Sequence, residues 1–115
     1  MTLREFYKAT GGDYSDVSRR LGSDELIKRF VLKFRNDNSM SEIKFGLATS
    51  DRERAFRAAH TLKGLCLNLS FGNLCTAASA LTERLRSGST DGCEKLLAAV
   101  ESEYKALILA ISDIT

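Results

Sequence analysis

The sequence contains no proline among its 115 residues. Proline interrupts helices because it lacks an amide donor and clashes with the preceding turn, so its absence permits long helices. No run approaches the roughly 20 consecutive apolar residues of a membrane-spanning helix. The first residues also lack the apolar stretch of a signal peptide. We therefore expect a cytoplasmic protein without membrane association.

Cysteine and histidine are scarce, with three cysteines and one histidine in the chain. Cys66, Cys75 and Cys93 form no close pair, which argues against a disulfide framework and against the short ligand spacings of a zinc site. Free thiols of this kind usually pack in a core and indicate a reducing compartment. We expect no metal and no cofactor.

The charges are nearly balanced, with a formal net charge of +2. This excess is too small to indicate a nucleic-acid partner, and the signs alternate as they do on solvated helix faces. The hydrophobic content of 43% and charged content of 28% are those of an ordinary soluble protein. The length fits one domain with one core, spanning residues 1–115.

Apolar residues recur every three or four positions in four successive segments, which is the spacing of one helix face. The segments cover residues 26–47, 55–69, 74–85 and 93–111. A polar run at 36–39 divides the first, which is either one kinked helix or two nearly collinear helices. The pattern predicts an all-α fold: an antiparallel up-down four-helix bundle over residues 23–114, with short accessory helices in residues 1–22.

Several helix starts carry capping residues. Thr2 with Glu5 predicts a capping box for a first helix that ends near Ala9, and Asp13 predicts a second start. Further starts are expected at Ser23, at the boxes Ser39 with Glu42 and Ser50 with Glu53, and at Asp91 with Glu94.

The single histidine, His60, lies in the middle of the helix expected over residues 50–70. The core stripe of this helix comprises Ala55, Ala58, Leu62, Leu65 and Leu69, with Ala59 and Cys66 at its edge. At about 100° per residue, His60 lies nearly opposite that stripe. The helix period alone therefore predicts that the imidazole points outward.

The residues around His60 suggest a contact surface. Phe56 and Leu67 are apolar side chains on a helix face that should be exposed to solvent. Lys63 supplies a cation that can pair with an anionic group bound to the imidazole. Gly64 costs a helix about 1 kcal/mol relative to Ala, so its place one turn beyond His60 suggests a position kept open for access.

The run Ala59-His60-Thr61-Leu62-Lys63-Gly64 resembles the A-H-x-L-K-G signature of histidine-containing phosphotransfer (HPt) domains. In that family the motif lies on the second helix of a four-helix bundle, and the resemblance extends from about Leu26 to Leu109. This chain departs from the family in two ways. Leu65 and Cys66 follow the motif, where small residues are common, and Ser70 lies near the end of the helix, where a second glycine is usual, with Gly72 two residues later.

The resemblance implies a role for each motif residue. His60 would carry the phosphoryl group, Lys63 would help to hold it, and Gly64 would leave room for the partner. The predicted docking residues are Phe56, Arg57, Leu67 and Asn68. Family members often place a glutamine on the next helix to hydrogen-bond the imidazole, and Thr82 or Glu83 is the candidate substitute here.

The implied function is a relay of phosphoryl groups between aspartates of response-regulator receiver domains. The protein would be a monomeric phosphocarrier without autokinase activity, the receiver would supply Mg²⁺, and a hybrid histidine kinase is a further candidate partner. The alternative is a non-phosphorylated helical adaptor that binds receivers or other signalling partners. A metal site of His60, Cys66 and Cys75 is disfavoured, because Cys66 belongs to the core side of the helix.

Overall fold

The computed structural model describes residues 1–115 and is entirely helical. The helices are α1 (Leu3–Ala9), α2 (Tyr14–Leu21), α3 (Asp24–Lys33), the 3₁₀ turn η1 (Phe34–Asn36), α4 (Ser39–Ala48), α5 (Arg52–Leu69), α6 (Gly72–Arg86) and α7 (Glu94–Ser112). The segment predicted as one kinked helix or two nearly collinear helices is therefore two helices, α3 and α4. The 3₁₀ turn η1 and the polar residues after it separate them.

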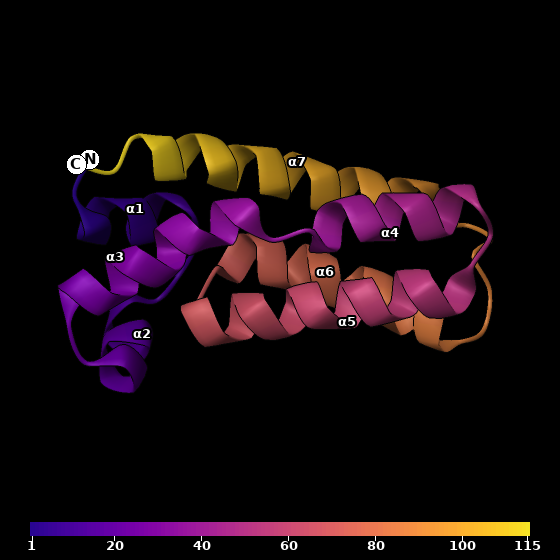
Figure 1. The fold of residues 1–115 in the computed structure, drawn as a ribbon, viewed down its shortest axis with the longest axis horizontal. Helices are drawn as coiled ribbons and strands as arrows, with labels where there is room; N and C mark the ends of the chain where they lie inside the picture. Colours follow the sequence, from indigo (N-terminus) through magenta and orange to yellow (C-terminus); the bar gives the residue numbers. More distant parts are fainter.

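Four helices, α4 to α7, follow the long axis of a molecule that measures 40 × 23 × 20 Å (Figure 1). α5 packs against α4 on one side and α6 on the other, and α6 packs against α7. α1, α2 and α3 gather at one end, where both chain termini also lie (Figure 1). There the Thr115 amide donates to the Met1 carbonyl at 2.9 Å.

The first three capping predictions are confirmed. Thr2 and Glu5 form a reciprocal capping box at α1. The Asp13 carboxylate accepts from the Asp16 amide at α2, and the Ser23 hydroxyl accepts from the Leu26 amide at α3. Each cap satisfies an amide that the first helical turn leaves without a partner.

The capping boxes predicted at Ser39 and Ser50 are wrong. The Asp37 carboxylate accepts from the Ser39 amide at 2.9 Å, so Ser39 is the first residue of α4 and Asn38 precedes it as N-cap. Ser50 has a left-handed φ of 55°, whereas an N-cap is usually extended. Asp51 caps α5 instead, by accepting from the Arg54 amide.

The start predicted for the last helix at Asp91 with Glu94 is wrong, because α7 begins only at Glu94 and Asp91 does not cap it. Cys93 is the N-cap and makes no side-chain hydrogen bond there. The Asp91 carbonyl instead accepts from Arg84, with Nε at 3.0 Å and Nη2 at 2.6 Å. The connection between α6 and α7 is thus held by a side chain of α6.

The core runs through α5, whose fully buried positions are Ala55, Ala59, Leu62 and Cys66. The observed buried face is rotated slightly from the predicted stripe. Leu65, predicted to lie in the stripe, is only half-buried, and Cys66, predicted at its edge, is completely buried. The N-terminal helices extend this core with Phe6 and Tyr7, which make edge-to-face or stacked contacts with Phe71. Residues 1–22 therefore supply core side chains as well as surface.

None of the helices combines the length and the apolar character needed to cross a bilayer. All three cysteines are free, with Cys66 and Cys93 buried and Cys75 half-buried. Burial raises the pKa of the Cys66 thiol, and Cys75 and Asp37 nearby act in the same direction. Burial also raises the pKa of Cys93. Raised pKa values favour the unreactive thiol form, so these residues act as core packing.

We predict that Gly46→Ala destabilises the protein. A Cβ at Gly46 would lie 2.7 Å from the Ala55 amide nitrogen and 2.9 Å from the Ala55 Cα, so α4 and α5 would have to separate. Overpacking of this kind costs about 1–3 kcal/mol, which outweighs the helix preference for Ala. Urea unfolding measures the free energy, and an unchanged midpoint would contradict the close approach of the two helices.

Candidate functional site

The site is built on α5, which is fixed at its start by two side chains. The Asp51 carboxylate caps the first turn. The Arg52 guanidinium donates from Nη1 to the Leu85 carbonyl of α6 at 3.0 Å. The first turn of α5 is therefore tied to the last turn of α6.

His60 is exposed, as the helix period predicts. Its immediate neighbour Ala59 and the following Leu62 are fully buried on the opposite side of α5. The imidazole therefore stands in solvent on the face that neither α4 nor α6 covers.

Phe56 forms the base of the site. Its ring is parallel to the His60 imidazole, with the two centroids 6.0 Å apart. Phe56 is half-buried and packs against the core, so it supports the imidazole from one helical turn below. The structure thus makes Phe56 a neighbour of His60 as well as part of the predicted surface.

Two arginines approach the Phe56 ring, and sequence reasoning missed their role. The Arg86 guanidinium carbon lies 5.2 Å from the ring centroid and that of Arg52 lies 6.0 Å away. Arg86 comes from the end of α6, which lies beside the start of α5. Little in the sequence indicated this contact. Arg86 is the last residue of α6, and the antiparallel packing of α5 and α6 brings the end of α6 close to Phe56.

Gly64 is open in a way that the other helical glycines are not. A Cβ built at Gly64 meets no atom within 4 Å, whereas one at Gly72 would lie 1.9 Å from the Gly11 carbonyl oxygen. Gly46 is likewise enclosed by Ala55. The fold of this chain therefore requires glycine at 46 and 72 and leaves position 64 unconstrained.

The remaining predicted site residues lie along α5 on either side of His60. Lys63 is half-buried, Arg57 and Asn68 are exposed, and Leu67 is 56% exposed. Arg57 also lines a polar groove of about 470 Å³ between α4 and α5, which contains the Arg54–Glu42 ion pair. His60 is therefore flanked by cationic side chains, with the exposed apolar Leu67 further along the helix.

Neither Thr82 nor Glu83 hydrogen-bonds the His60 imidazole in the structure. Thr82 is completely buried, and its hydroxyl donates to the Ala78 carbonyl of its own helix at 2.7 Å. Glu83 is exposed and pairs with Arg86 at 3.4 Å. A threonine is short enough to bond back to its own helix, whereas the glutamine of the resemblance has two more carbons of reach.

No group of three or more His, Cys, Asp and Glu side chains is arranged to hold a metal ion. Cys66 is fully buried while His60 is exposed on the other side of α5, so the two side chains do not meet. What the site offers is one imidazole, an adjacent ammonium and guanidinium groups. Such a set suits a nucleophile that takes up an anionic group.

The sequence model of the Hpt domain family matches residues 25–110. The chain is a member of the Hpt domain family. No curated protein and no solved structure matches it significantly. Hpt domains have a histidine phosphotransfer role in two-component signalling, where they interact with kinases and response regulators. The family match confirms the resemblance seen in the sequence and leaves residues 1–24 outside it.

We predict that Gly64→Ala stabilises this Hpt domain by about 0.5–1 kcal/mol, because Ala is preferred to Gly inside helices and the added methyl group meets no other atom within 4 Å. Urea unfolding measures the change, with Gly46→Ala as a matched control that moves in the opposite direction. A loss of stability in Gly64→Ala would show that the fold itself needs this glycine.

Proposed function

We propose that this Hpt domain is a phosphorelay carrier that receives a phosphoryl group on His60 from the aspartate of one receiver domain and passes it to another. The observation that carries the proposal is the exposed imidazole at the centre of α5, with open space beside it at Gly64. α4 to α7 would act as the up-down four-helix bundle of the family, holding α5 in place.

The chemistry follows from the groups present. A neutral ring nitrogen of His60 attacks the phosphorus of the aspartyl phosphate roughly in line. The N–P bond forms as the bond from phosphorus to the aspartyl oxygen breaks, and the carboxylate leaves with that electron pair. The Lys63 ammonium then pairs with the phosphoryl oxygens. Return of the group to a second receiver reverses these steps.

The receiver would bring the Mg²⁺ and most of the charge stabilisation. Phe56 would keep the imidazole in place through its parallel ring, at 6.0 Å between centroids. Arg86, over the same ring, would add positive charge where the acidic pocket of a receiver approaches. Gly64 would admit the rim of that pocket, because no side chain occupies the space.

The same proposal places the protein in the cytoplasm as a monomer. It has three free thiols, two of them buried, which suits a reducing compartment. The domain would receive its phosphoryl group from receivers, including that of a hybrid histidine kinase, and would not phosphorylate itself from ATP. Residues 1–22 would be integral to the domain, because they contribute Phe6 and Tyr7 to its core.

The proposal predicts that wild-type protein mixed with ³²P-labelled phosphorylated receivers acquires an acid-labile, alkali-stable label, and that His60→Gln acquires none. His60 is exposed, so His60→Gln should keep its helical circular dichroism and serves as a folded control. Lys63→Ala retains the imidazole and should accept the group more slowly. Stable receiver binding with no label on wild type would favour the adaptor alternative.

A further inference from the structure

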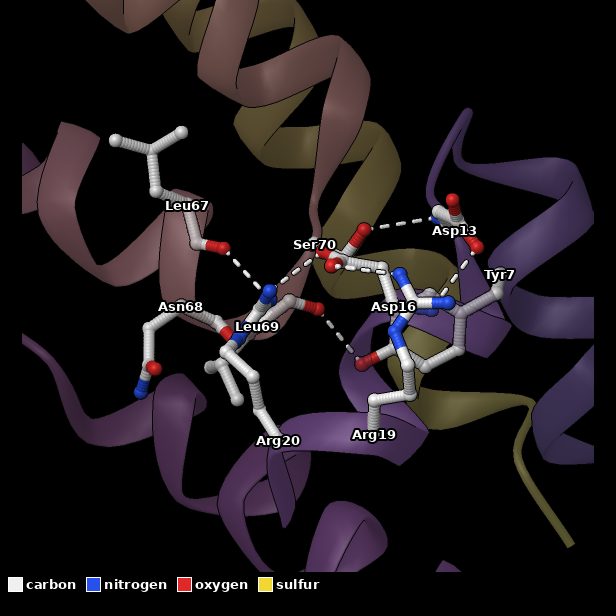
Figure 2. Close-up of polar contacts among 9 residues, drawn as sticks. All are labelled: Tyr7, Asp13, Asp16, Arg19, Arg20, Leu67, Asn68, Leu69 and Ser70. Carbon is white, nitrogen blue, oxygen red and sulfur yellow. Dashed lines mark hydrogen bonds and ion pairs between the residues drawn. The ribbon is translucent and has the colours of Figure 1, made fainter. Parts of the chain in front are cut away.

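The end of α5 lacks the usual glycine and is completed by the N-terminal segment instead. Ser70 follows the last helical residue in the left-handed conformation, with φ 57°. The last carbonyls of a helix have no partner within it. Here they accept from Arg20 and Tyr7, which belong to α2 and α1 (Figure 2).

Arg20 makes the most extensive of these contacts. Its Nη2 donates to the Leu67 carbonyl at 2.9 Å and to the Asn68 carbonyl at 2.8 Å, and its Nε lies 3.2 Å from the latter. Its Nη1 pairs with Asp16 at 2.6 Å. One edge of the planar guanidinium therefore pairs with Asp16 of α2, and the other edge donates to the last carbonyls of α5 (Figure 2).

Arg19 provides a contrast at the adjacent position. Its side chain is 74% exposed, and its one polar contact is to Asp16 at 3.5 Å. The two neighbouring arginines carry equal charge, but only Arg20 reaches the backbone of α5.

Three further contacts make the attachment specific. The Tyr7 hydroxyl donates to the Leu69 carbonyl at 2.8 Å, and the Asp13 amide donates to the Ser70 hydroxyl oxygen at 2.9 Å. A Cβ at Gly12 would lie 2.1 Å from the Ser70 carbonyl oxygen, so the two backbones touch. A glycine at position 70 would adopt the left-handed conformation more easily but would lose the bond to Asp13.

The carbonyls that Arg20 holds belong to Leu67 and Asn68, whose side chains are exposed on the His60-bearing helix. We propose that Arg20 is a positioning residue for receiver docking: it fixes the last turn of α5 so that Leu67 and Asn68 meet the receiver in one orientation. This inference rests on the proposed function, and it assigns that role to a residue outside the region matched by the family, 25–110.

The mechanism separates docking from chemistry. A frayed last turn would present Leu67 and Asn68 in many orientations, and each encounter would have to order them again. His60 lies about two turns earlier in α5, where its support comes from Phe56 and the core. Loss of Arg20 should therefore weaken receiver binding and leave the transfer step itself unchanged.

The test compares Arg20→Gln with Arg19→Gln, which removes the same charge beside it. The receiver is the one that binds wild type most tightly in a panel of purified receivers. Arg20→Gln should raise its Kd and the KM for phosphotransfer about fivefold, with the maximal transfer rate within about twofold of wild type. Arg19→Gln should resemble wild type in all three quantities. Arg20→Lys, which keeps the charge without the planar fork, should fall between the two.

Equal Kd values for Arg20→Gln and Arg19→Gln would overturn the inference, as would a fall in maximal rate with unchanged KM. If Arg20→Gln does not fold, the Kd of Arg20→Lys decides, and a wild-type value would again overturn it. If wild type binds a receiver but accepts no phosphoryl group, the proposed function is refuted. The Kd values of Arg20→Gln and Arg19→Gln would still test the role of Arg20 in receiver binding. Wild type that binds no receiver in the panel would refute the inference.

Discussion

The burial of the inner face of α5 between α4 and α6 is the constraint on which the site depends. Small residues permit it: Gly46 of α4 lies against the backbone of Ala55, and Ala59 is completely buried. With that face enclosed, the helical period leaves one direction for His60, into solvent. The same packing fixes Phe56, whose ring supports the imidazole. Core packing and presentation of the reactive group are thus two consequences of one helix orientation.

Both ends of α5 are held by side chains from other helices. Arg52 binds α5 to the last turn of α6 through the Leu85 carbonyl, and Arg20 and Tyr7 of the N-terminal helices complete its other end. A helix fixed at both ends and along one face presents its remaining face without further ordering. Pre-organisation of this kind lowers the entropic cost of binding a partner. The N-terminal helices therefore belong to the packed structure that holds α5 in place.

The sequence sufficed to predict the helices and the direction of His60, because both depend on local periodicity. The capping predictions failed where an aspartate lies close to the serine. Asp37 accepts from the Ser39 amide, which places Ser39 inside α4, and Asp51 caps α5 in place of Ser50. The roles of Arg20 and Arg86 were missed because each acts across helices, at a position that no local pattern marks. Thr82 was misjudged for a related reason, since its short side chain bonds to its own helix.

The central claim is that the uncovered face of α5 is the surface a receiver uses. The most direct test is an NMR titration of ¹⁵N-labelled protein with a beryllofluoride-activated receiver. We expect the largest amide shift changes at His60, Gly64 and Leu67, with smaller changes in α2 and none along α7. Changes concentrated on α7, with the amides around His60 unaffected, would contradict it.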